Sequence, residues 1–370
     1  MARVLFIMKR RDKGVAGSWN HSPTGDPLPS GLSVSATQMA FALDELKIES
    51  KLIQVIDNNC IDREVTAYQP THVIIEAFWV VPDKFDVLCK LHPTVEWIIR
   101  NHSKSDFLSH EGGMVGWAID YISRGLTLAC NSPEATADFQ RLAVTVGACP
   151  HNVVYLPNFY RANKLTKNFF MIKVWKFLRW AGIPGRNPIK KTELKIGCFG
   201  AIRPLKNHLH QALASIEAAD RLGVKLMFHV NGTRIEGKAE PILNSLRQLF
   251  KRNKWHELVE LPWMEHVEFT KFSSTMDVLM QVSNSETFNI VAADSVSMGI
   301  PVVVSPEIPW LDCEYHVSPN DVQAQAKKLI KIWKSSGNGY LQQDQLLNLR
   351  EYAEVSKNIW AHYLDHQVLK

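Results

Sequence analysis

The sequence predicts an α/β fold made of two doubly wound, parallel-sheet domains with a cleft between them. Its 370 residues exceed the length at which a single hydrophobic core usually keeps growing. Short apolar runs rich in valine and isoleucine alternate with longer amphipathic stretches, which is the pattern of strand–helix–strand units. This alternation is interrupted once, by a basic segment and a Gly/Pro cluster at 181–188, and then begins again.

In the first half, six apolar runs are candidate strands: Val4–Met8, Lys51–Ile56, His72–Phe78, Val95–Arg100, Leu126–Cys130 and Val153–Leu156. Helical patterns such as Ser33–Leu46 and Pro133–Val146 lie between them. Parallel strands require such crossovers, and the crossovers are right-handed, so an open doubly wound sheet follows. The polar loop from Arg10 to Leu32 is either a lid over the cleft or a disordered loop.

After the interruption, candidate strands recur at Lys195–Phe199, Lys225–Val230, Asp277–Val282 and Pro301–Val304. The last 50 residues read as two helices separated by a Ser/Gly/Asn run at 335–339. We therefore expect a first domain at 1–158, a basic aromatic helix and linker at 159–194, and a second domain at 195–335. Residues 336–370 are expected to pack back toward the first domain.

Composition narrows the class of protein. With 46% hydrophobic and 21% charged residues, the chain is globular rather than disordered. No apolar run approaches the roughly 18 residues of a membrane span, and the first apolar run is too short for a secretory signal. The six cysteines contain no CxxC pair, which is typical of reduced thiols. These features indicate a cytoplasmic protein, or one of the host cytoplasm if it is encoded by a phage.

The most informative segment runs from Ser283 to Val304. A strand is expected to end near Val282, a helix to begin near Asn289, and Gly299 to end that helix. The first N–H groups of a helix lack intrahelical partners and its dipole is positive there, so the position suits a diphosphate. Two carboxylates, Glu286 and Asp294, flank it.

This segment resembles the signature of the large retaining GT-B glycosyltransferase group, the glycosyltransferase group 1 type. That signature combines Ser-x-x-Glu-x-Phe-Gly with a second glutamate, in a Glu-x7-Glu spacing, and Gly-x-Pro-Val. The matching positions are Ser283, Glu286, Phe288, Gly299, Pro301 and Val302. Asn289 stands where the group has glycine, and Asp294 stands where it has the second glutamate. The resemblance implies a GT-B fold, with two Rossmann-like domains.

The resemblance also implies roles at this site. Glu286 would contact the donor sugar hydroxyls or lie near its phosphate, and Asp294 would bind the nucleotide ribose. The amides of Phe288, Asn289 and Ile290 would hold the diphosphate. Without the resemblance, Glu286 is an ordinary acid at a helix N-terminus and Asp294 a solvated helix residue.

A second match lies at 196–207, where a strand is followed by Gly200 and a turn. The group has an arginine and then a Lys-Asn or Lys-Gly pair here, which neutralise the departing diphosphate. Lys206 and its following asparagine align, but Ala201 occupies the usual arginine position. Either Arg203, two residues later, reaches the phosphates, or Lys206 carries most of this role. The alternative is a plain surface turn.

The first half resembles the group more weakly. His102 follows a candidate strand and is similar to a histidine that the group delivers to the donor sugar. An isolated histidine is more often structural than functional, so a structural role for His102 is the alternative. Gly31 precedes a helix in a segment that resembles the group's Gly-Gly turn near the phosphates, with only one glycine kept. The resemblance spans roughly residues 1 to 310.

For mechanism, the resemblance implies retention of anomeric configuration and front-face attack. No Asp-x-Asp pair follows a candidate strand, so we expect no metal and no cofactor; the donor is a nucleotide-diphosphate sugar, with a UDP-sugar expected. Lys206, Arg203 and the helix start would stabilise the leaving diphosphate. A nucleotide-sugar epimerase would need an acid–base set that we do not find.

The acceptor is suggested only by the basic, aromatic segment 160–195. Between Arg161 and Lys195 there are ten basic residues and one acid. This composition suits DNA, in the manner of phage enzymes that glycosylate hydroxymethylated bases. It also suits a helix on anionic lipid, with a surface polysaccharide or lipid-linked glycan as acceptor. A third interpretation is an ordinary helix with a buried aromatic face. The candidate DNA contacts are Arg161, Lys164, Lys167, Lys173, Lys176 and Arg179.

Overall fold

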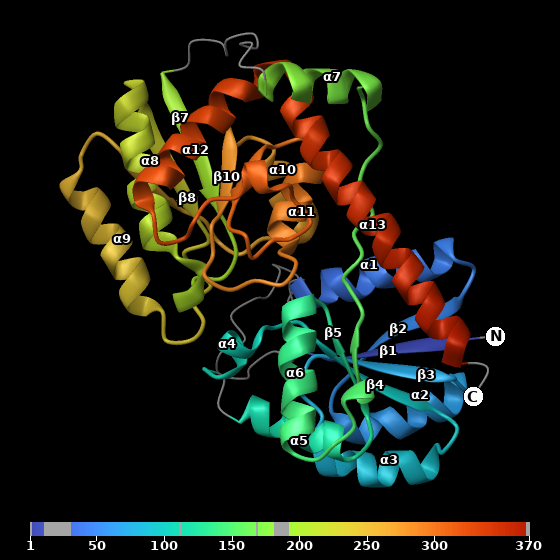
Figure 1. The fold of residues 1–370 in the computed structure, drawn as a ribbon. Helices are drawn as coiled ribbons and strands as arrows, with labels where there is room; N and C mark the ends of the chain where they lie inside the picture. Colours follow the sequence, from blue (N-terminus) through green and yellow to red (C-terminus); the bar gives the residue numbers. More distant parts are fainter. Residues whose placement is uncertain (1, 11–30, 111–112, 168, 181–191, 368–370) are drawn as a thin grey trace. The chain divides into compact units, whose positions relative to one another are not determined.

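The computed structural model describes residues 2–10, 31–110, 113–167, 169–180 and 192–367 (Figure 1). The chain divides into two compact units. One contains the described residues through Arg161 together with those from Tyr352 onward, and the other contains Ala162–Glu351. The predicted lid loop after Arg10 and the Gly/Pro cluster at 181–188 lie outside the described residues.

The first unit is built on a parallel sheet, and its described strands follow the order β2-β1-β3-β4-β5-β6. From β1 the chain crosses to β2 on one side and then to β3 on the other. This reversal is a topological switch point, beside which open α/β sheets bind ligands. The strands are β1 (Arg3–Lys9), β2 (Glu49–Val55), β3 (His72–Glu76), β4 (Glu96–Asn101), β5 (Thr127–Cys130) and β6 (Val153–Tyr155).

Helices cover both faces of this sheet, so its central strands are apolar on both sides. Leu5 and Ile7 contribute to the core on one face, whereas Val4 and Phe6 contribute to the core on the other, because successive side chains alternate. The first core includes side chains of α2 (Ile61–Tyr68), α3 (Phe85–Leu91), α4 (Ser105–Leu108), α5 (Met114–Ser123) and α6 (Pro133–Thr145). The second includes those of α1 (Gly31–Glu45) and α13 (Tyr340–Gln367).

The second unit also has a parallel sheet, with described strands in the order β11-β10-β7-β8-β9. The chain runs from β7 outward through β8 and β9 and then returns to β10, on the other side of β7. A second switch point therefore lies between β7 and β10. The strands are β7 (Glu193–Cys198), β8 (Lys225–Val230), β9 (Glu257–Glu260), β10 (Val278–Gln281) and β11 (Val302–Val304).

In the second unit, α8 (His208–Leu222) packs against α12 (Val322–Ser335). The long helix α13 begins in the second unit and ends in the first, since the division between the units falls after Glu351. Among the described residues, no helix combines the length and hydropathy that a membrane crossing requires. The helices are α7 (Phe169–Trp180), α8 (His208–Leu222), α9 (Glu240–Arg252), α10 (His266–Ser273), α11 (Ile290–Ser297), α12 (Val322–Ser335) and α13.

The basic segment forms less helix than its sequence pattern predicts. The pattern is helical from Tyr160, but α7 begins only at Phe169. Before it, side chains of other elements take the backbone groups that a helix would use: the Thr166 N–H donates to Gln343 Oε1 at 2.6 Å, and the Arg161 N–H donates to a glutamine of α1 at 2.7 Å. Tertiary partners therefore replace local hydrogen bonds in this stretch.

Candidate functional site

Two loops meet at the switch point of the second sheet, one after β7 and one after β10. Gly200, directly after β7, has a φ of 109°, which only glycine adopts at little cost. Its N–H donates to Asn231 Oδ1 at 2.9 Å. From β10, Gln281 Nε2 donates to the carbonyl of Phe199 at 3.1 Å. Side-chain to backbone bonds thus hold both loops at the carboxyl ends of their strands.

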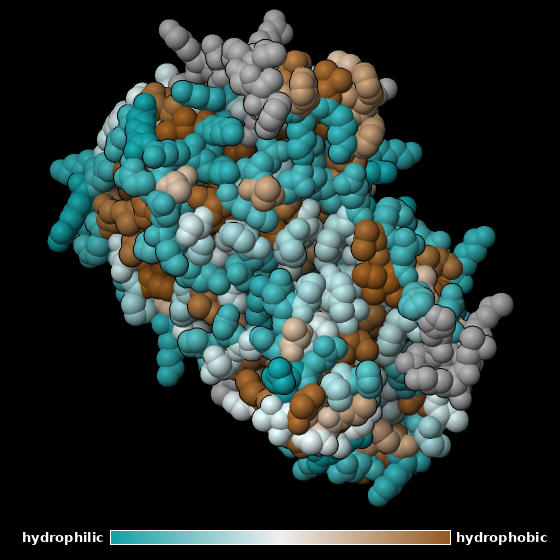
Figure 2. Space-filling model, viewed as in Figure 1, coloured by the Kyte–Doolittle hydropathy of each residue, from teal (hydrophilic) through white to brown (hydrophobic). Residues whose placement is uncertain are grey.

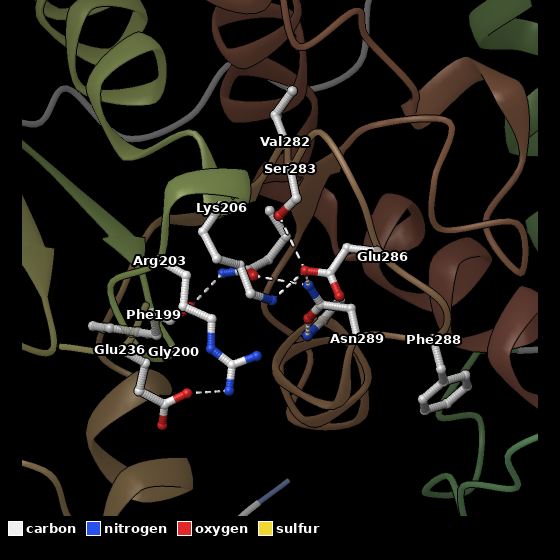
Figure 3. A network of polar contacts seen from close by, with 12 residues as sticks. Phe199, Gly200, Arg203, Lys206, Glu236, Val282, Ser283, Glu286, Phe288 and Asn289 are labelled. Carbon is white, nitrogen blue, oxygen red and sulfur yellow. Dashed lines mark hydrogen bonds and ion pairs between the residues drawn. The ribbon is translucent and has the colours of Figure 1, made fainter. Parts of the chain in front are cut away.

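Lys206 and Glu286 come together where these loops meet (Figure 3). Lys206 ends a short 3₁₀ turn, and the Asn284 N–H donates to the carbonyl of Leu205 at 2.8 Å, which ties the two loops to each other. The Lys206 ammonium pairs with Glu286 Oε1, and Ser283 Oγ donates to the same oxygen at 3.1 Å. Both charged side chains retain partial exposure, 21% for the lysine and 11% for the glutamate.

Asn289 explains one departure from the GT-B signature. It has φ 64° and ψ 90°, a conformation that glycine adopts freely and asparagine tolerates better than other residues. Its Oδ1 accepts from the Ala292 N–H at 2.9 Å and so caps α11. Its Nδ2 donates to Glu286 at 3.0 Å and to Gln281 at 2.9 Å. The substitution keeps the backbone turn and adds a support for Glu286.

The residues beside Asn289 form the start of α11. Phe288 is buried, its ring lies 5.8 Å from that of Trp310, and its carbonyl accepts from Trp310 Nε1 at 2.7 Å. Figure 3 shows this ring turned away from Glu286. Ile290 is the first residue of the helix. The backbone from 288 to 290 therefore lies where a helix N-terminus favours an anion.

Arg203 pairs with Glu236, which also accepts from Arg234 Nε at 2.6 Å (Figure 3). Burial by itself raises the pKa of Glu236, but the charges of Arg203 and Arg234 outweigh it and hold that pKa below its ordinary value. The Arg234 guanidinium also lies over the ring of Trp263, 4.2 Å from its centroid. Two guanidinium groups thus share one carboxylate, which leaves positive charge at this edge of the cluster.

Asp294 is turned toward a neighbouring helix. It is 2% exposed, and its Oδ1 lies 2.9 Å from Nε2 of His266 on α10. The hydrogen bond to Asp294 raises the pKa of His266 above its ordinary value, against the opposing effect of burial. Asp294 is therefore not the solvated helix residue of the alternative interpretation, and His266 is a neighbour that the sequence analysis did not identify.

In the first unit, His102 follows β4 and belongs to a buried charged network. Its Nε2 lies 2.6 Å from Glu76 Oε2, and Arg100 Nη1 donates to Glu76 Oε1 at 2.9 Å. Arg100 Nη2 donates to Asn158 Oδ1 at 2.6 Å. Glu76 and Arg100 are opposite each other on β3 and β4, and both side chains are fully buried.

Charge sets the protonation state of Glu76 in this network, and burial sets that of His102. Burial raises the pKa of Glu76, but Arg100 and His102 outweigh it, so its pKa is lowered and the carboxylate is ionised. Burial lowers the pKa of His102 despite the attraction of Glu76, so the imidazole is neutral near pH 7. Its Nε2–H then donates to Glu76, and Nδ1 carries the lone pair.

The sequence analysis missed Glu76 and Arg100. A signal was present, because each is a charged residue that directly follows the apolar run of its strand, and their signs are opposite. Buried charges are usually paired, so such residues on neighbouring strands are candidate partners. Gly31 is the exposed first residue of α1, and the loop before it lies outside the described residues.

The site residues predicted from the sequence fall in both units. The second unit brings together Lys206, Glu286, Asn289 and Gly200, with Arg203 nearby, whereas His102 and Gly31 belong to the first.

The predicted DNA contacts differ in their exposure to solvent. Arg161, Lys164, Lys167 and Lys173 are exposed, whereas Lys176 pairs with the protein's own carboxylates. The side chain of Arg179 lies outside the described part of the chain.

No protein-family model and no curated protein sequence matches the chain. Among solved structures, Anabaena Alr3699/HepE in complex with UDP-glucose matches with a TM-score of 0.61 and 12% identity, over 100% of this chain and 99% of that one. The UDP-forming α,α-trehalose-phosphate synthase of Burkholderia xenovorans, in complex with glucose-6-phosphate, matches with a TM-score of 0.66 and 12% identity, over 98% and 99%. The similarity covers both units, and the chain has the GT-B fold of glycosyltransferases.

Proposed function

We propose that the protein is a glycosyltransferase that uses a UDP-sugar as donor. The observation that carries this proposal is the meeting of Lys206 and Glu286 beside the start of α11, at the switch point of the second sheet. The HepE protein, with the same fold, was solved with UDP and with UDP-glucose. The GT-B fold alone hosts several donors, so the charge of the site is the more specific support.

In this proposal the donor diphosphate lies against the backbone of Phe288, Asn289 and Ile290. Lys206 then exchanges its pairing with Glu286 for a phosphate oxygen, which leaves the carboxylate to accept hydrogen bonds from sugar hydroxyls. Asp294 binds the ribose, with His266 as its neighbour. Positive charge fixed where the diphosphate departs stabilises the transition state more than the ground state.

Metal independence and retention of configuration are further parts of the proposal. Lys206 and Arg203 supply positive charge to the leaving group without a divalent ion. EDTA should therefore leave transfer unchanged, and NMR of the product should show the anomeric configuration of the donor. Strict dependence on a divalent metal, or an inverted product, would contradict these parts.

The test of the donor proposal is UDP release from a panel of UDP-sugars. Lys206→Ala should reduce the rate by about 100- to 1,000-fold, as is usual when one preorganised electrostatic contact is lost. Lys251→Ala, at an exposed position in the last turn of α9, is the matched control and should retain the wild-type rate. Equal rates for wild type and Lys206→Ala would refute the assigned role of the lysine.

Two acceptor classes belong to this proposal, a hydroxymethylated base in DNA and a glycan at a membrane face. Both were inferred from the basic segment at 160–195. Within it, Lys176 forms ion pairs with Asp312, Glu314 and Asp344 and is not directed outward. Phe170 and Phe177 of α7 are exposed, and this apolar outer surface favours the membrane-face acceptor. Comparing sugar transfer to hydroxymethylated duplex DNA and to a lipid-linked glycan distinguishes the two.

A further inference from the structure

Helix α7 is apolar on two opposite faces. On the inner side, Ile172 and Trp175 are buried. On the outward side, Phe170 is 70% exposed and Phe177 is 62% exposed. The outward face continues through Val174, which is partly exposed, and Leu178, which is 37% exposed. A surface helix of a globular protein normally presents polar residues to water, so this outward face has the character of a binding surface.

The helix is held firmly by its inner face. The ring of Trp175 stacks on that of Tyr340, with 6.1 Å between centroids and 18° between planes. The Lys176 ammonium pairs with Asp312 and lies 3.2 Å from both Glu314 and Asp344. The outward exposure of Phe170 and Phe177 therefore does not come from a detached helix.

The contact of Lys176 on the inner face of α7 also supplies positive charge to a cluster of carboxylates. Among the described residues, Asp312, Glu314 and Asp344 form one group of carboxylates close enough to hold a metal ion, with ligand atoms within 4.8 Å of one another. Lys176 provides positive charge there. Burial opposes the charge on Lys176, but its hydrogen bond to Asp312 and the surrounding carboxylates outweigh burial and raise its pKa.

Basic side chains lie on α7 and in the chain just before it. Lys173, on the helix, lies 5.2 Å from the ring centroid of Phe169. Lys164 and Lys167 are exposed just before the helix, where the Lys167 ammonium lies 5.3 Å from the ring centroid of Tyr340. Figure 2 shows brown and tan surface with adjacent teal where Figure 1 draws α7. An outward apolar, aromatic face with exposed lysines on the same helix and just before it matches the composition of helices that lie in the interface of an anionic bilayer.

We propose that the outward face of α7 binds the surface of an anionic membrane, with Phe170 and Phe177 inserted at the headgroup level. DNA accounts for the lysines but not for a continuous face that also contains Val174 and Leu178, since neither of these side chains stacks on bases. This proposal deepens the membrane-face acceptor class proposed above. Its readout is binding to lipid, so its failure is distinguishable from a failure of the donor proposal, whose readout is UDP release.

The experiment is flotation of the full chain with vesicles of phosphatidylcholine and phosphatidylglycerol in equal parts, and with phosphatidylcholine alone. Binding should require the anionic lipid and weaken as salt rises. The double variant Phe170→Ser/Phe177→Ser should weaken vesicle binding by at least about tenfold, because two large apolar side chains no longer enter the lipid. The matched control is Val87→Ser/Leu91→Ser on α3, which also changes two exposed apolar residues of one helix, 50% and 55% exposed, and should bind as the wild type does.

Three outcomes would overturn the proposal. The first is wild-type protein that does not float with anionic vesicles, and the second is equal flotation of the wild type and the Phe170/Phe177 variant. The third is a wild-type dimer in sedimentation velocity that the same variant converts to monomer while its vesicle binding is unchanged. Equal circular dichroism and UDP release for the two double variants show that folding and donor use are intact.

Discussion

At the scale of single residues, the network of Glu76 and Arg100 shows what buried charge does for this fold. The two side chains are fully buried and face each other across β3 and β4. Taking both from water is costly, and the cost is offset only while each keeps its partner. His102 uses the second oxygen of Glu76, so the orientation of its ring depends on the same carboxylate.

Glu76→Gln should therefore lower the free energy of unfolding by roughly 3 kcal/mol or more, because Arg100 becomes a buried charge without a counterion. Urea denaturation measures this loss. Glu49→Gln is the control, since it removes a surface pair with Arg3 and should change stability little. The folded-state pKa of Glu76 is lowered, so its contribution is present above the ordinary glutamate pKa of about 4.3 and is lost as pH falls through the lower folded value. A difference that stayed constant into acid would contradict this assignment.

The pair of His266 and Asp294 should have the opposite pH dependence. The folded-state pKa of His266 is raised, so its stabilising contribution is complete below the ordinary histidine pKa of about 6.5 and is lost as pH rises through the higher folded value. The stability difference between wild type and His266→Gln should be largest in mild acid and shrink toward alkaline pH. Unfolding measured over this pH series is the test, and the dependence should disappear in an Asp294→Asn background.

At the scale of elements, the residue that caps α11 performs two tasks. Asn289 caps the helix through Oδ1 and supports Glu286 through Nδ2, while its backbone has a positive φ. The turn conformation and the hydrogen bonds can be separated by substitution, because glycine keeps the first and alanine keeps neither.

In chemical unfolding, we expect the wild type to be the most stable, the Asn289→Gly variant less stable, and the Asn289→Ala variant the least stable. Glycine loses the side-chain bonds but adopts the turn freely, whereas alanine should be less stable than glycine by roughly 1 kcal/mol because of its positive φ. An alanine variant at least as stable as the glycine variant would show that the backbone conformation of this turn is not strained. UDP release should fall in both variants, since Glu286 loses the same support in each.

At the scale of the whole molecule, α13 contributes to two cores. Its first part belongs to the second unit, and its last part, with the fully buried Trp360, belongs to the first. Trp360 Nε1 donates to the carbonyl of Pro157 at 2.8 Å, and Arg100 lies over its ring. The last part of α13 is thus part of the first unit, although it follows the second unit in sequence.

Trp360→Ala should destabilise the first unit by about 3–5 kcal/mol through loss of apolar contact and the cavity that remains. Hydrogen exchange should accelerate in β1 and β3 and change little in β7 and β8. Val355→Ala, at a position of α13 that is 57% exposed, should alter neither set of peptides. Uniform acceleration in both sheets would mean that the two units unfold together.

The strands show how much of the fold the apolar pattern of the sequence predicts. Ten runs predicted as strands overlap strands of the structure, because each strand contains a short apolar run and the central strands are buried on both faces. β9, with the sequence Glu-Leu-Val-Glu, was missed because it is short, lies at the edge of its sheet and carries charges at both ends. β3 was predicted to reach Phe78 but ends at Glu76, where Ala77 adopts a φ of 67°.

The sequence by itself determined two parallel-sheet domains, the loop with Gly200 and the helix start at Asn289, because period, turn residues and caps are local properties of the chain. Only the tertiary structure decided which charges meet. Lys206 pairs with Glu286, 80 residues away, and Lys176 pairs with Asp312, 136 residues away. A charged side chain that folding removes from water needs a partner of opposite charge. The strand order and the loop connections determine which partner lies near it, and a local sequence pattern does not contain that information.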